Sequence, residues 1–508
     1  MHLTVSNVDL AIVGLYLAGV VLFGVWVGRR QGSVSEYLVA DRNLPWWLLL
    51  LSIVATETSS VTFLSVPGTA YVGNLTFLQL AMGYVLGRYA VAGLLLPHYF
   101  RGELFSAYEV LERRFGGATK QAASALFLVT RSLADGLRLF LCAIVLKAMM
   151  FPAATANARE PTFDWQLSIS VLVIGGATIA YTFLGGMKAV AWTDFAQFFI
   201  YVGGALVAGA IILTRLPGGW AELTRDAGQN GKLQLFDLGL DLTRPYTLWA
   251  GLAGGAFISL GSHGADQLMV QRYLSARSQR EAARALVLSG WVVLVQFAFF
   301  LALGVGLWGF FGGRQFKRSD QVFVTFIVEQ LPVGAVGMTL AAVLAATMST
   351  ISSSLNSLAA VASRDFYFPL GASQAAGFQS LRVTRGLTVL FGIVQIGVAV
   401  CGQYLRSNVI EAVLAIAGFT TGIVLGTFFL GVLTRRVSQP AALAALLGGL
   451  SGMTYVAFGT RLSWTWFALI GSCGTFLLGL AASTIWPQRE PPPTPVAFAQ
   501  RDRAEQLH

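Results

Sequence analysis

Apolar runs long enough to cross a lipid bilayer recur from one end of the chain to the other. A run of about 18 or more residues with few charges predicts a transmembrane helix. Thirteen such segments can be drawn, with edges uncertain by about 2–4 residues. They are 7–28, 46–69, 76–99, 119–150, 165–185, 188–214, 246–271, 283–311, 333–363, 382–401, 408–433, 440–459 and 463–486. The pattern predicts an all-α polytopic membrane protein with one membrane domain over residues 1–486.

Composition supports the same class of protein. Only 11% of the 508 residues are charged and 55% are hydrophobic, whereas soluble proteins carry about 25% charged residues. Lipid must therefore solvate most of the surface. The net charge of +10 does not indicate a nucleic-acid partner, because the basic residues lie in short loops between apolar runs, where they orient a membrane protein.

The distribution of basic residues predicts how the chain lies in the cell membrane. An odd number of segments places the two termini on opposite sides. With the N-terminus outside, about 20 Lys and Arg fall in inside loops and about 10 in outside loops, as the positive-inside rule prefers. The inside residues include Arg42, Arg101, Arg113, Arg114, Lys120, Arg272, Arg277, Arg280, Arg284, Arg435 and Arg436. We expect a disordered cytoplasmic tail at 487–508 and a short interfacial helix or loop at 105–116.

The second segment is interrupted by polar residues near its middle. Five of the eight residues from Ala55 to Thr62 carry a hydroxyl group, and Glu57 carries an acid. An ionisable residue at this depth is costly unless it is paired, so it indicates function. We expect the helix to unwind near Thr56–Ser59 and to leave carbonyl groups free to bind a cation. The alternative is that the hydroxyls bond back onto the helix or to a neighbour.

The ninth segment carries a serine-rich face. Ser349, Ser352 and Ser353 are spaced i, i+3 and i+4, so they share one side of a helix, and Thr350 adjoins them. Hydroxyl and carbonyl oxygens suit a hard cation such as sodium. Close packing of small residues is the alternative, but packing does not require seven hydroxyls between Thr347 and Ser357.

Three further breaks introduce charge into apolar runs. Asp194 lies about two turns inside the sixth segment. In the fourth segment, Arg131, Asp135 and Arg138 lie on one face, and two arginines beside one carboxylate leave a positive excess that could meet Glu57 or an anionic substrate. In the seventh segment, His263 and Asp266 lie among glycines, which suggests a second interrupted helix.

Segments two and seven, the two interrupted ones, lie five apart. Two inverted repeats of five helices would place corresponding helices at this spacing. The spacing favours transport by rocking of one repeat against the other around a central site.

Four blocks of sequence resemble the sodium:solute symporter family, which includes the sodium/glucose, sodium/proline, sialic acid and vitamin transporters. The blocks are Glu36–Trp47, Tyr181–Val190 with Trp192–Gln197, Asp266–Leu274, and Ala346–Asn356. The resemblance extends over about residues 8 to 435 and implies a leucine-transporter-like core, at about 46–433, of two inverted five-helix repeats.

The resemblance also implies two sodium sites. The first would use the carbonyl groups of Ala55, Thr58 and Ala346 and the hydroxyl groups of Ser349 and Thr350. The second, present in some members, would use Asp194, Ser352 and Ser353. Relatives contact substrate at positions that match Glu57, Ser59 and Thr62 and through segments 3, 4 and 7, which makes Arg131, Asp135, Arg138 and Asp266 candidates here.

The expected function is sodium-coupled import of a small organic solute by alternating access, and the protein is not expected to be an enzyme. Ala81 stands where some relatives have a polar substrate ligand, which weakens the case for a sugar. The segment-four arginines favour a carboxylate. One alternative is a proton-coupled carrier that uses Glu57 and Asp194. Another is a ligand-binding sensor or a channel-like protein. Substrate identity, sodium stoichiometry and oligomeric state stay open.

Overall fold

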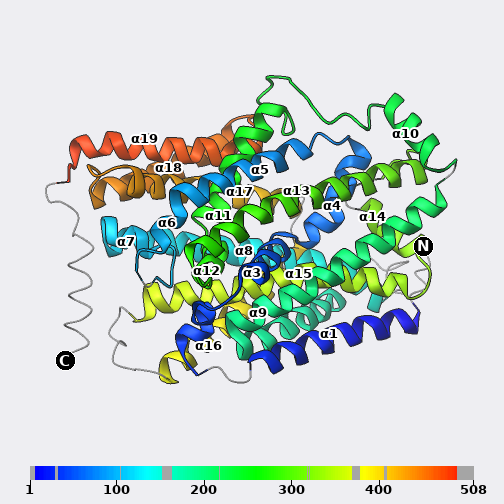
Figure 1. Ribbon diagram of the computed structural model, residues 1–508, viewed down its shortest axis with the longest axis horizontal. Coiled ribbons are helices and arrows are strands. Elements are labelled where there is room, and N and C mark those ends of the chain that lie inside the picture. Colours follow the sequence, from blue (N-terminus) through cyan, green and yellow to red (C-terminus); the bar gives the residue numbers. More distant parts are fainter. Residues whose placement is uncertain are drawn as a thin grey trace.

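In the part of the chain that it describes, the computed structural model is built from helices joined by loops and has no strand. The described residues are 6–28, 32–102, 104–151, 163–216, 218–316, 318–319, 321–368, 378–404 and 409–488. Long helices lie side by side along the longest axis of the molecule (Figure 1). The fold class predicted from apolar periodicity is confirmed.

The elements follow one another in a simple order, with short 3₁₀ and π turns labelled η. They are α1 (Asn7–Gly28), α2 (Val34–Val39), η1 (Ala40–Arg42), α3 (Trp46–Glu57), α4 (Ser60–Val72), α5 (Leu78–Ala90), η2 (Val91–Leu95), α6 (Leu96–Tyr99), α7 (Glu109–Phe115), α8 (Gly117–Met150), α9 (Trp165–Arg215), α10 (Gly219–Gln229), η4 (Ala250–Gly254), α11 (Gly255–Gly264), α12 (Gln267–Leu274), α13 (Gln279–Phe310), α14 (Gln321–Gln330), α15 (Ala335–Val361), η5 (Ala362–Tyr367), α16 (Phe378–Cys401), η8 (Gly402–Tyr404), α17 (Val409–Leu433), α18 (Gln439–Gly459), η9 (Trp464–Trp466) and α19 (Phe467–Ile485).

Each of the thirteen predicted segments coincides with helical residues. Among the described residues, eight helices are long and apolar enough to cross a membrane, or nine if the bent pair α3–α4 is one span. Predicted segments five and six both fall in α9, which bends sharply at Gly186, where φ is 49° and ψ is −157°. A count of thirteen spans therefore stays a prediction.

The bundle is built around α15. This helix is buried along almost its whole length, and it packs against α9, α8, α1, α16 and α3. Its small side chains allow the neighbouring backbones to approach closely. The serine-rich face of the ninth segment is therefore inside the protein and not against lipid.

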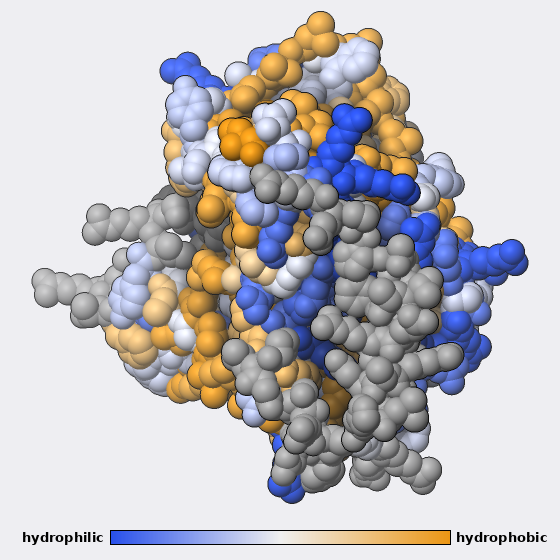
Figure 2. All heavy atoms as spheres, turned by 90° about the vertical axis from the view of Figure 1, so that its left-hand side faces the viewer, coloured by the Kyte–Doolittle hydropathy of each residue, from blue (hydrophilic) through white to orange (hydrophobic). Residues whose placement is uncertain are grey.

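The first and last long helices have their outer termini at opposite ends of the bundle. In Figure 1, α1 begins at the right-hand end and α19 finishes at the left-hand end, which agrees with an odd number of crossings. Figure 2 views the left-hand end and shows hydrophilic side chains over its middle and right, with hydrophobic side chains around them. The short helix α7 agrees with the prediction for 105–116.

The start of the predicted tail is ordered. Pro487 pairs with Val437, and the amide of Gln488 donates to the carbonyl of Arg436 at 3.1 Å. These two residues are held against the residues just before α18, and the disordered tail predicted at 487–508 stays a prediction. The rest of the predicted tail, 489–508, lies outside the described residues, as do Arg29 and Arg30 of the first loop.

Candidate ion and substrate site

The second segment is broken where its sequence predicts. Helix α3 ends at Glu57, Thr58 and Ser59 are extended, and α4 begins at Ser60 at an angle of 63° to α3. The last carbonyl groups of a helix have no amide partner within that helix. The break therefore presents backbone oxygens to the centre of the bundle, as an ion site requires.

The serine-rich face of α15 meets this break directly. The hydroxyl of Thr350 donates to the carbonyl of Thr56 at 2.9 Å and lies 3.3 Å from the carbonyl of Ala346. The members of the predicted first sodium site are all nearly or fully buried; they are Ala55, Thr58, Ala346, Ser349 and Thr350. The set thus brings together the end of α3, the extended turn and one face of α15. Thr58 also behaves as the alternative for this segment predicts, namely that hydroxyls bond back onto the helix, because its hydroxyl donates to the carbonyl of Val54 at 2.8 Å.

Asp194 of α9 lies next to this set. Its Oδ1 accepts a hydrogen bond from the Ser349 hydroxyl at 2.6 Å, and its Oδ2 accepts one from Ser52 at 2.6 Å. The Ser353 hydroxyl is 3.1 Å from that of Thr56. Ser352 donates to the carbonyl of Ser349 at 3.1 Å. Two of the three predicted second-site residues, Asp194 and Ser352, therefore contact Ser349, which belongs to the predicted first site, and Ser353 lies one turn further along α15.

Arg272 also enters this cluster, which corrects one assignment made from the sequence. The positive-inside argument counts it as a loop residue, but the structure buries it in α12. Its Nη2 is 3.1 Å from Asp194 Oδ2 and also bonds to the hydroxyls of Thr56 and Ser353. Arginine at the edge of an apolar segment looks like a loop residue unless the helix is known to turn inward.

A cavity of about 280 Å³ adjoins the break. Four of the predicted substrate residues line it, namely Glu57, Ser59, Thr62 and Arg138. Further hydroxyl groups and an aromatic side complete the wall, supplied by Ser65, Thr69, Ser259, Ser262, Phe77, Tyr84, Tyr246, Phe297 and Trp464. The lining suits a small solute with one polar end and one apolar part.

The charge of Glu57 is matched by Arg88, which is not among the predicted site residues. Arg88 of α5 is fully buried, and its guanidinium bonds to the Glu57 carboxylate. Nε2 of His263 lies 3.7 Å from the same carboxylate. The position of this arginine inside predicted segment three could have identified it as a site residue, because ionisable residues in membrane helices indicate function.

The other predicted substrate residues, Arg131, Asp135 and Asp266, do not line this cavity. Arg131 pairs with Asp266, which caps α12 by accepting from the Leu268 amide at 2.9 Å. Asp135 lies 3.7 Å from Arg131 and 2.5 Å from Arg138. The positive excess expected in segment four is therefore balanced by Asp266. Of these residues, Arg138 alone is among those lining the larger cavity.

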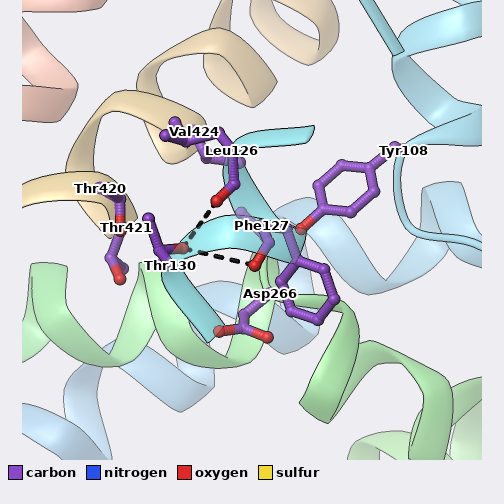
Figure 3. Close-up of a pocket in the computed structure, with 10 residues that line it drawn as sticks. Tyr108, Leu126, Phe127, Thr130, Asp266, Thr420, Thr421 and Val424 are labelled. Atoms are coloured by element: carbon purple, nitrogen blue, oxygen red, sulfur yellow. Dashed lines mark hydrogen bonds between the residues drawn. The ribbon is translucent and has the colours of Figure 1, made fainter. Parts of the chain in front are cut away.

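Asp266 instead lines a smaller cavity of about 30 Å³ between α8, α11 and α17 (Figure 3). Tyr108 and Thr130 also line it, and the hydroxyl of Thr130 donates back to the carbonyl of Leu126 at 2.8 Å. The ion pair of Arg131 and Asp266 thus ties α8 to the second interrupted helix.

Comparison with known proteins decides the family. The model of the sodium:solute symporter family matches residues 37–449. The chain belongs to this family. It is a multi-pass membrane transporter and not an enzyme, and sodium is the coupling ion of its family.

This sodium:solute symporter is similar to relatives with different substrates. It is 29% identical to the sodium/sialic acid symporter NanT of Aliivibrio fischeri, over 91% of this chain and 90% of that protein. It is 30% identical to the human sodium/iodide cotransporter, over 86% and 68% of the two chains. It is 29% identical to the sodium-coupled monocarboxylate transporter 2 of Bos taurus, over 92% and 72%.

Solved structures confirm the leucine-transporter-like fold of the symporter. A sodium-coupled sialic acid symporter in a substrate-bound outward-open state superposes with a TM-score of 0.84, at 25% identity and over 96% of this chain and 100% of that one. MhsT in complex with L-phenylalanine superposes with a TM-score of 0.53 at 15% identity, over 89% of this chain and 100% of that one. At this low identity, the similarity to MhsT shows a shared fold and says nothing about substrate.

Proposed function

We propose that this symporter imports a small organic anion together with sodium, by alternating access around the break between α3 and α4. The observation that carries the proposal is the contact between the Thr350 hydroxyl and the Thr56 carbonyl at 2.9 Å. It joins the extended turn to the serine-rich helix. A hard cation placed between the two elements would find hydroxyl and carbonyl oxygens on both sides.

Sodium in the first site would be held by the carbonyls of Ala55, Thr58 and Ala346 and the hydroxyls of Ser349 and Thr350. Bound there, the ion bridges the broken helix and α15 and stabilises a shape that accepts substrate. Loss of the ion on the inner side breaks this bridge. The membrane potential supplies about 2.3 kcal/mol per charge for each 100 mV, and the sodium concentration gradient adds to it.

Arg138 supports an anionic substrate. Its side chain lines the larger cavity, and its Nε has no hydrogen-bond partner among the described residues. A guanidinium with a free donor suits a carboxylate. Sialic acid, iodide and monocarboxylates, which the names of the relatives give as their substrates, are all anions in neutral water. We therefore propose a monocarboxylate with an apolar part that packs against the aromatic wall.

The test is uptake into proteoliposomes under a sodium gradient. Replacing Ser349 and Thr350 together by Ala should abolish sodium-stimulated uptake while the protein stays folded in the membrane. The matched control replaces Thr347 and Ser357, whose hydroxyls bond back to Val343 and Ser354 within the same helix. Unchanged sodium dependence in the Ser349 and Thr350 variant would overturn the site.

A panel of monocarboxylates, sugars and neutral amino acids in the same assay identifies the substrate class. A proton-coupled carrier that uses Glu57 and Asp194 would instead show uptake driven by a pH gradient without sodium. Saturation at carrier rates argues against a channel. We expect saturable, sodium-stimulated uptake of one or more of the monocarboxylates. We expect no uptake of the sugars or the neutral amino acids.

A further inference from the structure

Two opposite charges are buried together at the centre of the bundle. Asp194 is fully buried and the side chain of Arg272 is 1% exposed. Breaking such a pair leaves an uncompensated charge in a medium that cannot solvate it. The guanidinium therefore neutralises Asp194 in this conformation without a second sodium ion.

The guanidinium reaches the oxygens that a second sodium ion would need. Its Nη2 contacts Asp194 Oδ2 and the hydroxyls of Ser353 and Thr56, and its Nε donates to Ser52 at 3.0 Å. Two of the three residues of the predicted second sodium site are thus engaged. Ser352 differs, because its hydroxyl donates to the backbone carbonyl of Ser349.

We propose that the guanidinium of Arg272 is a tethered cation that competes with sodium for the second site. The inference rests on the proposed function, since it concerns the regulation of that same site. Two positive charges that share Asp194 Oδ2 and the Ser353 hydroxyl repel each other and cannot both bind at full strength. Sodium enters the second site only when the guanidinium leaves it.

The competition connects the two interrupted helices. Arg272 belongs to α12, which begins after the break at Ala265 and Asp266, and its Nη1 donates to the carbonyl of Leu268 in the same helix at 2.7 Å. Displacing the guanidinium from Asp194 removes a contact of α12 with α3, α9 and α15. Occupation of the second site by sodium therefore frees α12 to move.

The test compares the sodium dependence of uptake in the wild type and in Arg272→Gln. The neutral amide leaves Asp194 without its resident cation, so sodium takes the second site at lower concentration. The half-saturating sodium concentration should fall several-fold and the Hill coefficient should rise toward one more ion. A Hill coefficient and half-saturation equal to those of the wild type would overturn the proposal.

A second variant separates competition from a general change in the fold. Ser352→Ala in the Arg272→Gln background removes a sodium ligand that the guanidinium does not contact. The gain in sodium affinity and in Hill coefficient should then be lost. Retention of the full gain would mean that the gain does not arise at the second site, and it would also overturn the proposal.

Sodium-dependent thermal stabilisation of the purified protein gives a readout that needs no substrate. If Arg272→Gln does not fold, Arg272→Lys replaces it in this measurement. A lysine ammonium cannot bond at once to all the oxygens that the guanidinium contacts, so the rise in melting temperature should again occur at a lower sodium concentration than in the wild type. A shift identical to that of the wild type would reject competition. Absence of any sodium effect in the wild type would reject the proposed function itself, so the two failures are distinguishable.

Discussion

Several charged side chains inside the membrane domain lie in pairs of opposite sign. Four arginines each contact a carboxylate, and the pairs are Arg88 with Glu57, Arg131 with Asp266, Arg138 with Asp135, and Arg272 with Asp194. Pairing offsets the large cost of removing each charge from water. Because these eight side chains balance, an anion that enters beside them is neutralised best by a cation that travels with it. This balance agrees with the sodium coupling of the family to which the chain belongs.

The role of Arg138 is tested by Arg138→Gln. Loss of a hydrogen bond to a charged group costs about 1.5–3 kcal/mol, so the KM for the transported acid should rise about 10- to 150-fold. Sodium-driven uptake measured over a range of substrate concentrations checks this. The comparison variant is Arg131→Gln, which removes a charge that does not line the larger cavity; an equal rise in KM there would contradict direct contact by Arg138.

The pair of Arg88 and Glu57 should contribute strongly to stability. Arg88→Gln leaves the Glu57 carboxylate without its partner, and breaking a buried pair costs about 3–5 kcal/mol. Unfolding of the purified protein by denaturant measures the loss. The matched control is Arg244→Gln in the exposed pair with Asp237, where Arg244 is 58% exposed and a change below about 1 kcal/mol is expected. Equal losses of unfolding free energy in Arg88→Gln and Arg244→Gln would contradict a special contribution of the buried pair to stability.

At the scale of elements, the breaks and bends are set by short local sequences. Helix α3 stops where hydroxylated residues follow Glu57, and α11 stops at Gly264 before the capping residue Asp266. Hydroxyl and carboxyl side chains near a helix end bond to nearby backbone groups and so compete with the helix. Both interruptions could be predicted for this reason.

The bend of α9 depends on Gly186. With φ at 49° and ψ at −157°, this residue adopts a conformation that a side chain opposes. Gly186→Ala should lower the free energy of unfolding by about 1–3 kcal/mol, measured by denaturant unfolding. Gly176→Ala in the same helix is the control, because its added Cβ would meet nothing within 4 Å and alanine favours a helix. A stable Gly186→Ala protein would contradict a required bend.

The end of the bundle near α7 should respond to pH. Burial, with Asp365 nearby, raises the pKa of Glu109 to about 7, whereas a glutamate in an unfolded chain titrates near 4.3. The folded protein then binds more protons between these values, so its stability falls as the pH rises from about 4.5 to about 7.

Glu109→Gln should flatten this part of the stability profile. Thermal unfolding at pH 5, 6, 7 and 8 checks the slope, and the exposed Glu222→Gln is the matched control. A profile for Glu109→Gln that falls as steeply as that of the wild type would contradict the role of Glu109.

At the scale of the whole molecule, the orientation in the membrane is the main open prediction. The prediction places the basic loops inside and the loop at 230–246, which has no helix, outside. After replacement of Cys142, Cys401 and Cys473, a cysteine introduced by Leu238→Cys should react with an impermeant maleimide on intact cells. A cysteine from Arg280→Cys should react only after permeabilisation. The reverse pattern would mean an inside N-terminus.

The sequence alone determined the membrane class, the approximate positions of the apolar helical segments, the two interruptions and the serine-rich face. Hydrophobic length and local hydroxyl, glycine and acidic residues are enough for these features, because each depends on residues close together in the chain. The family resemblance added the residues of the two ion sites, and these assignments stay predictions.

Only the tertiary structure decided which charges meet. Glu57 pairs with Arg88 and not with the arginines of α8, Arg131 turns to Asp266, and Arg272 lies inside against Asp194. Each pair joins different helices, so it depends on how those helices are rotated and packed. A one-dimensional pattern shows that a buried charge needs a partner, but the choice among partners is made by the packing of the bundle.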